Sequence, residues 1–374
     1  MPWYNDLRPI DDANKQHYAL IFPGMTNTEK VRTIQNILKL RESLKTIPEK
    51  RTDKNLLVCS WNLKDFGAYR QRIPESYFYM AEIFSKFDLV SVQECRADLE
   101  PLNILLRILG SDWTYLYNDV SDHEGSNSER SLIVYDKRRC NFSGQAGEII
   151  LHHKISENHD LKQFNRIPYL TGFTAEWKKF SLITLHLQPG KNVSDVEIRK
   201  AEIKFLMKLL EKRLKRTSEV RLWSDNIIIL GDMNLYKTDT EAFQILTDNH
   251  FVEVAELIGK DTTTAASDNV FDRIFFYKNS EYPALETTNK GGVFRMFDTV
   301  FTDEQANDPA YLIYIDALEQ QRIEAGEGPY ADKTNYYKTH WRTRQMSDHY
   351  PIWVEMEIDS SDEFLRKKLR DFES

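Results

Sequence analysis

Short apolar runs, each bounded by polar or turn-forming residues, recur along most of the chain. Runs of this length and composition are typical of β-strands. They predict strands at residues 56–61, 89–93, 131–135, 180–187, 226–230, 273–277 and 351–358. The chain therefore contains the skeleton of a sheet protein.

Amphipathic stretches with helical spacing lie before and between these strands. Residues 29–44 place Val31, Ile34, Ile37, Leu38 and Leu44 at helical intervals, with Thr28 as the expected cap. Residues 194–216 predict the clearest helix, because Ser194 and Glu197 have the spacing of a capping box. Thr238 and Glu241 repeat that spacing, and residues 309–322 predict one more helix.

Strands that end in polar clusters, interspersed with helices, predict two sheets packed face to face with helices outside. We expect one large domain at residues 55–359, preceded by an extension at 1–54 that carries one amphipathic helix. Gly291-Gly292 and the polar region that follows indicate an insertion at 279–344, and residues 360–374 read as a polar tail.

Composition narrows the class of protein. The 374 residues are 41% hydrophobic and 12% aromatic, which excludes a disordered or fibrous chain. No apolar run approaches the roughly 20 residues of a membrane-spanning helix, and the start does not resemble a signal peptide. Cys59 and Cys95 lie in predicted strands, where buried, reduced thiols are expected. We therefore expect a cytoplasmic protein, and nothing indicates an obligate protein partner.

The formal net charge of −8 argues against a protein that coats nucleic acid by bulk charge. A negative net charge is compatible with an enzyme that has a local basic groove. Basic residues gather on the predicted helix 194–216, where we interpret them as a solvated face that Glu197, Glu202 and Glu211 partly neutralise.

Polar residues at the ends of the predicted strands carry the candidate chemistry. Any one of them has an ordinary explanation as a turn or strand-end residue. Burial would penalise the carboxylates of Glu94, Asp232, Asp272 and Asp348 by several kcal/mol unless each is paired or metal-bound. A cluster of carboxylate and amide oxygens without a cysteine pair suits Mg²⁺, Mn²⁺ or Ca²⁺, which phosphate-ester cleavage uses.

Six motifs in this order resemble those of the DNase I-like endonuclease/exonuclease/phosphatase superfamily, and they are closest to DNase I. The motifs begin with Ser60-Trp61-Asn62-Leu63 and Gln93-Glu94, continue with Leu185-His186-Leu187 and Gly231-Asp232-Met233-Asn234, and end with Phe271-Asp272-Arg273 and Ser347-Asp348-His349. The resemblance implies an α/β (α+β) fold, a four-layer sandwich of two mostly antiparallel sheets flanked by helices. It also implies metal-dependent hydrolysis of phosphodiesters.

The resemblance assigns a role to each motif residue. Glu94, Asn62 and Asp348 resemble the metal environment, with Mg²⁺ or Mn²⁺ as the expected ion and Ca²⁺ as an alternative. Asp232 and Asn234 resemble the pair that orients the attacking water and the phosphate.

The same resemblance covers the residues that would contact phosphate. His349, held by Asp272, resembles one phosphate-contacting histidine, and His186 resembles the second. Glu129 in Asn127-Ser128-Glu129-Arg130 matches the glutamate partner of that second histidine. Arg166 resembles the arginine that grips the scissile phosphate, and Arg96 is a further substrate-binding candidate.

Three hypotheses about function remain open from the sequence. The first is a DNA endonuclease that directs an activated water in line at the phosphate, with DNA favoured over RNA. The second is a phosphatase or phosphodiesterase for a small molecule or lipid headgroup. The third is a catalytically silent binding module with the same fold. Three features of the sequence depart from DNase I and weaken the inference about the substrate. The tyrosine with which DNase I contacts the minor groove is replaced near Asn127-Ser128, and Phe271 stands where DNase I has a tyrosine. The calcium-binding loops and disulfides of DNase I have no counterpart in this sequence.

Overall fold

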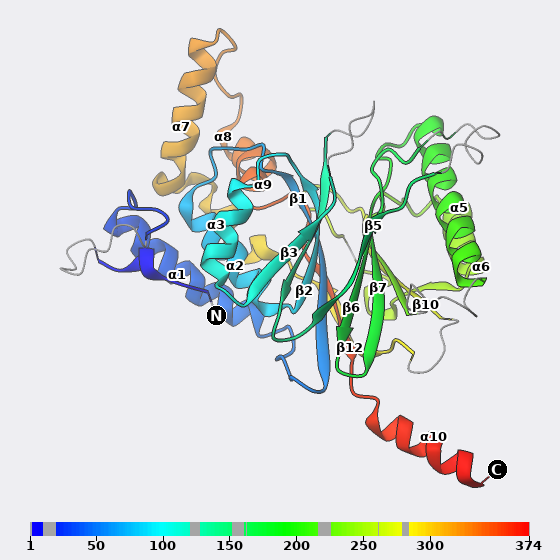
Figure 1. The fold of residues 1–374 in the computed structure, drawn as a ribbon. Coiled ribbons are helices and arrows are strands. Elements are labelled where there is room, and N and C mark those ends of the chain that lie inside the picture. Colours follow the sequence, from blue (N-terminus) through cyan, green and yellow to red (C-terminus); the bar gives the residue numbers. More distant parts are fainter. Residues whose placement is uncertain are drawn as a thin grey trace.

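The computed structural model describes residues 2–9, 20–119, 128–151, 161, 163–215, 226–260, 262–278 and 284–373. These residues form two six-stranded sheets (Figure 1). The first sheet, in spatial order, contains β11 (Thr287–Val293), β12 (Ile352–Glu357), β1 (Asn55–Phe66), β2 (Leu89–Cys95), β4 (Arg130–Asp136) and β3 (Trp113–Tyr117). The second contains β5 (Asn141–Glu148), β6 (Tyr169–Ala175), β7 (Lys178–His186), β8 (Ile227–Asp232), β10 (Asp272–Tyr277) and β9 (Phe251–Glu253).

Each sheet has one parallel pair at its centre. β1 pairs with β2 and β7 with β8 in parallel, whereas the other neighbours are antiparallel. Parallel neighbours end at the same edge of a sheet, so residues at the ends of these strands come together.

Helices cover the outer face of each sheet (Figure 1). α1 (Asn27–Leu44), α2 (Pro74–Lys86) and α3 (Glu100–Leu109) pack on the first sheet, and α5 (Val193–Lys215) and α6 (Thr240–Asp248) pack on the second. One apolar cluster lies under each set of helices, and a third fills the space between the sheets. This is the predicted four-layer α/β sandwich, so the expected fold class is confirmed.

All seven predicted strands form, and two of the strands that the pattern missed, β5 and β11, lack an apolar run. β5 exposes most of its side chains at one edge of the second sheet. β11 lies at one edge of the first sheet and contains Gly291 and Gly292, which pair with Val354 and Trp353 of β12. Backbone pairing to a neighbour therefore holds segments whose side chains carry no strand signal.

The helix predicted at residues 29–44 forms as α1, but two details of the prediction were wrong. Thr26, not Thr28, caps the helix, because Thr26 accepts from the amide of Glu29 in a capping box. Val31, Ile34 and Leu38 are exposed, whereas Ile37 and Leu44 are buried as expected.

The buried face of α1 is partly polar. Lys30 donates to the carbonyl of Arg8, and Asn36 donates to the hydroxyl of Tyr79. These partners lie outside the helix, so the helix periodicity could not reveal which face packs inward.

The caps predicted for the next two helices were also wrong. α5 begins at Val193, and the side chain of Asn192 accepts from the amide of Asp195 at 2.9 Å. α6 begins at Thr240, with Asp239 at the cap position but without a side-chain capping bond. Asn127, Arg216 and Asn279, which belong to predicted segments, lie outside the described residues.

The segment from residue 284 onward contains several helices besides β11. α7 (Pro309–Glu324) forms where residues 309–322 predict a helix, and α8 (Lys333–Tyr336) and α9 (Arg342–Gln345) follow it. Tyr337 and Trp341 are buried in the core under α1 and α2. α10 (Ser361–Glu373) extends from the end of β12 away from the sandwich (Figure 1).

Two further expectations concern the cysteines and the membrane. Cys59, Cys95 and Cys140 are free and buried, which confirms the expected reduced thiols. Within the described part of the chain, no helix has the length and apolar character needed to cross a membrane.

Candidate active site

Strand register lines up three of the predicted site residues on the second sheet. His186 at the end of β7 is the register partner of Asp232 at the end of β8. Asp272, the first residue of β10, is the register partner of Asp232 on its other side. The backbone pairing therefore sets these three residues side by side at one edge of the sheet.

The first sheet brings Asn62 and Glu94 to the same place. Asn62 Nδ2 donates to Glu94 Oε1 at 2.8 Å and to Asp232 Oδ2 at 3.0 Å, so this amide links the two sheets. The β1–β2 register is interrupted between Asn62 and Phe66, and Glu94 has a φ of 60°. Non-glycine residues in this left-handed region cost about 1–3 kcal/mol and cluster at functional sites.

The Glu129 carboxylate fixes the orientation of the His186 ring by contacting Nδ1, the nitrogen that faces away from Asp232. His186 Nδ1 lies 2.8 Å from Glu129 Oε2, and the imidazole Nε2 lies 3.7 Å from Asp232 Oδ2. Arg166 Nε lies 3.3 Å from the same Glu129 oxygen. Burial favours the neutral acid, but the bonded imidazole and the guanidinium overcome it and lower the pKa of Glu129 to about 2.

The same carboxylate raises the basicity of His186. Burial opposes a charge on the imidazole, yet the hydrogen bond to Glu129 and the charge of Asp232 raise the pKa of His186 above its usual value. With Nδ1 committed to Glu129, a protonated ring presents an Nε2–H donor to the centre of the site.

A second histidine has the same arrangement on the opposite side of Asp232. His349 Nδ1 lies 2.8 Å from Asp272 Oδ2, and its Nε2 lies 3.7 Å from Asp232 Oδ2. Burial again opposes the charge, but Asp272 and Asp232 raise the pKa of His349 well above its usual range. Two imidazoles, each fixed by a carboxylate, therefore face one central aspartate.

Asn234 also lies at this edge, two residues after the end of β8. Its amide nitrogen donates to Asp232 Oδ1 at 3.1 Å, and its side-chain Nδ2 donates to the carbonyl of Leu187 at 3.1 Å. Its φ of 50° is a second left-handed backbone at the site, which Asn tolerates better than most residues. The turn that follows β8 is thus tied to the turn that follows β7.

Asp348 and Arg96 have partners that the sequence did not indicate. Asp348 Oδ2 lies 2.8 Å from Lys64 Nζ. Arg96 Nε donates to Asp65 Oδ1 at 2.9 Å, and another guanidinium nitrogen of Arg96 lies 3.9 Å from Glu129. Lys64 and Asp65 therefore join the site from the irregular end of β1.

Three residues among those described could share a metal ion. One ligand atom each from Glu94, His186 and Asp232 lies within 4.8 Å of the other two. Because His186 Nδ1 is bonded to Glu129 and its pKa is raised, its Nε2 suits proton donation better than metal ligation. The carboxylate oxygens of Glu94 and Asp232 are then the donors, and these suit a hard cation, whereas Asn62 turns its Nδ2 toward both carboxylates and its Oδ1 toward the amide of Lys64.

Sequence reasoning missed a buried carboxylate that supports the site. Glu202 on α5 accepts from the backbone amides of Asn165 and Gln188, both at 3.1 Å. These amides lie next to Arg166 and two residues after His186. Complete burial raises the pKa of Glu202 to about 7, although the two donors favour the carboxylate.

The charged face of α5 is consequently not uniformly solvated, and that interpretation was wrong for one basic residue, Arg199, and for one of the acids expected to neutralise the run, Glu202. Glu202 is fully buried, and so is Arg199, which pairs with Asp239 at 2.9 Å. The signal available in the sequence was that both positions lie close to the apolar stripe of Ile203 and Leu206.

Comparison with known proteins gives several similarities. No family model matches the chain. Human deoxyribonuclease-1 is 28% identical over 150 residues, which make up 38% of this chain and 52% of that protein. Mouse deoxyribonuclease gamma is 25% identical over 240 residues, or 59% of this chain and 70% of that protein. The match to human deoxyribonuclease-1 thus spans about half of that relative's length.

Solved structures give more distant similarities. A D. rerio TDP2 complexed with single-strand DNA product is 17% identical, with a TM-score of 0.48 over 81% of this chain and 99% of that one. An endonuclease/exonuclease/phosphatase family protein from Bacteroides thetaiotaomicron is 17% identical, with a TM-score of 0.48 over 82% of this chain and 98% of that one.

Proposed function

Because this chain belongs to the DNase I-like endonuclease/exonuclease/phosphatase superfamily, we propose that it is a metal-dependent phosphodiesterase that cleaves DNA internally. The carrying observation is the pair of carboxylate-held histidines whose Nε2 atoms both lie 3.7 Å from Asp232 Oδ2. The similarity to deoxyribonucleases supports DNA as the substrate.

The oxygen donors at the site fit a divalent cation such as Mg²⁺ or Mn²⁺. Glu94 is the ligand with the best access, because its side chain is about one-fifth exposed, whereas that of Asp232 is almost completely buried. Asn62 would stand beside it, and Asp348 could join only by releasing Lys64. When bound, the cation supplies polarisation of a phosphoryl oxygen and stabilises the charge that develops in the transition state.

The protein side chains would supply the other requirements of the reaction. A phosphodiester is anionic and resists attack, so its oxygens must be neutralised while water is held in line with the leaving oxygen. His186 and His349 would each donate an Nε2–H to the phosphate, and Arg166 would add positive charge. Asp232 lies between the histidines, where it could accept the proton of the attacking water.

A plasmid assay tests this proposal. Purified protein should nick supercoiled plasmid in the presence of Mg²⁺ or Mn²⁺ and lose that activity in EDTA. Asp232→Asn should abolish nicking, and Asp298→Asn, an exposed change outside the site, should not. Full activity of the Asp232→Asn variant would reject the role given to that residue.

Two other outcomes would favour the alternative functions. Release of phosphate from inositol phosphates without plasmid nicking would identify a small-molecule phosphatase. Absence of turnover on plasmid, single-stranded DNA, RNA and inositol phosphates with either metal would identify a binding module.

A further inference from the structure

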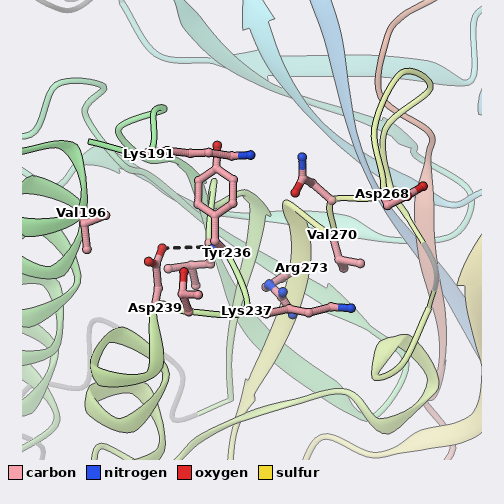
Figure 2. A pocket seen from close by; sticks show the side chains of 11 residues that line it. Lys191, Val196, Tyr236, Lys237, Asp239, Asp268, Val270 and Arg273 are labelled. Carbon is pink, nitrogen blue, oxygen red and sulfur yellow. Dashed lines mark hydrogen bonds between the residues drawn. The ribbon is translucent and has the colours of Figure 1, made fainter. Parts of the chain in front are cut away.

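A pocket of about 470 Å³ lies near the N-terminal ends of α5 and α6, with Val196 and Asp239 among its lining residues (Figure 2). Its walls come from Lys191 in the turn after β7, residues 235–239 after β8, and residues 268–270 and Arg273 around the start of β10. These are the same three strands that carry His186, Asp232 and Asp272. The pocket is therefore built from direct continuations of the strands that form the site.

Aromatic packing connects the pocket to the site. The ring of Tyr236 in the pocket meets the ring of Phe271 edge to face, with centroids 4.9 Å apart. Phe271 immediately precedes Asp272, which holds His349. The pocket and the site are therefore in contact through this pair of rings.

The charges that line the pocket are mostly positive. In Figure 2, Lys191 lies by the ring of Tyr236, and Lys237 and Arg273 lie further along the pocket. Within the described part of the chain, neither lysine forms an ion pair. Asp239 is already bound to Arg199 at 2.9 Å, which leaves Asp268 as the other acid among the lining residues. The pocket therefore has a local excess of positive charge, although the formal net charge of the protein is −8.

Arg273 adds a buried cation to the pocket wall. It is only 7% exposed, packs over the ring of Phe243, and pairs with Glu253 at 2.7 Å. Its Nε is buried and finds no hydrogen-bond acceptor among the described residues. Buried donors are normally satisfied, so an Arg with unused donor capacity favours an anion nearby.

Two helices begin near the pocket, with Asp195 in the first turn of α5 and Glu241 in that of α6. α5 starts at Val193 and α6 at Thr240, each within a few residues of the pocket wall. The N-terminal end of a helix carries a partial positive charge and free amide donors. Asp239 gives no side-chain capping bond to α6 because its carboxylate is committed to Arg199 and to the amide of Tyr236.

We propose that this pocket binds a backbone phosphate of the DNA strand next to the phosphate that is cleaved. The proposal rests on the proposed function. Lys191 and Lys237 would make the contacts, and Arg273 would add positive charge at the pocket wall. The ring of Tyr236 is already engaged by Lys191 at 5.0 Å, by Arg199 at 5.3 Å and by Phe271, so it offers no free face for stacking a base. The pocket therefore recognises the backbone rather than the sequence of the substrate.

The test compares two double variants. Lys191→Gln with Lys237→Gln removes the two lysine charges of the pocket, and Lys39→Gln with Lys45→Gln removes two exposed charges from α1 and its C-cap, on the far layer of the sandwich. Both pairs are surface changes and should fold. The values of kcat and KM are measured on a duplex oligonucleotide at several salt concentrations, and on bis(p-nitrophenyl) phosphate, which has no neighbouring phosphate.

For the pocket variant we expect KM on the duplex to rise about tenfold at 0.1 M salt. We also expect the slope of log KM against log salt concentration to fall by about one to two, because fewer phosphate contacts release fewer counterions. The control variant should match the wild type. An unchanged KM and salt slope would overturn the proposal, and so would an equal loss on the small diester, since that would mean damage to the site itself.

Binding in the absence of turnover separates this proposal from the proposed function. Anisotropy of a fluorescent duplex is measured with Asp232→Asn alone and in combination with the two lysine changes. If the wild type cleaves DNA but the lysine changes alter neither KM nor Kd, the pocket proposal fails and the proposed function stands. If no DNA is cleaved, the proposed function fails, and the Kd values decide the pocket: a Kd that the lysine changes leave unaltered, or no binding at all, rejects it.

Discussion

Replacing Glu129 with Gln tests the electrostatic support of His186. The Glu129 side chain is about 5% exposed and contacts His186 and Arg166. These partners lower its pKa from an ordinary value of 4.5 to about 2. Each pKa unit is worth about 1.4 kcal/mol, so the charged carboxylate contributes about 3 kcal/mol to the stability of the fold at neutral pH.

The sign of the effect follows from the lowered pKa. Above about pH 4.5 the carboxylate is charged in both the folded and unfolded states, and the full contribution is present. As the pH falls toward 2 the unfolded state takes up the proton first, and the contribution is lost. Gln keeps an oxygen that can accept from His186 Nδ1, so the variant removes the charge but not the hydrogen bond.

Urea unfolding followed by tryptophan fluorescence measures this difference. We expect Glu129→Gln to lower the free energy of unfolding by about 3 kcal/mol at pH 7 and by about half as much at pH 3. Glu42→Gln, which removes an exposed partner of Lys45, should change it by less than about 0.5 kcal/mol at either pH. A loss for Glu129→Gln that is the same at both pH values would refute the electrostatic explanation.

Three further changes test other parts of the structure. Thr26→Ala should lower the free energy of unfolding by about 1 kcal/mol through loss of the α1 cap, and Thr28→Ala should have a smaller effect; the reverse order in urea unfolding would contradict the observed cap. Glu202→Ala leaves the part-buried amides of Asn165 and Gln188 without their acceptor, and we expect it to lower the free energy of unfolding by about 2–5 kcal/mol and to reduce plasmid nicking; unfolding equal to the wild type would show that these bonds contribute nothing. Mg²⁺ should raise the Tm of the wild type by selective binding to the folded state, whereas Glu94→Gln should show no such rise; an equal shift in both proteins by calorimetry would remove Glu94 from the metal site.

The sequence by itself determined the fold class and the set of candidate residues. Local apolar runs predicted seven strands correctly, because a buried central strand needs such a run whatever its neighbours are. Residues such as Asn62, Glu94 and Asp232 were identifiable because polar side chains at the ends of buried strands are expensive unless they are used. Their order along the chain was enough to indicate the superfamily.

Only the tertiary structure decided how these residues meet. The register of β7, β8 and β10 fixes which side chains are neighbours, and register depends on pairing between distant segments. Long-range contacts likewise brought Lys64 to Asp348 and buried Glu202 beneath the turns of Arg166 and His186. Lys30 and Asn36 of α1 face inward for the same reason, since their partners belong to other parts of the chain. Local patterns specify which elements form, whereas the partners of a buried polar group are set by contacts that no local pattern contains.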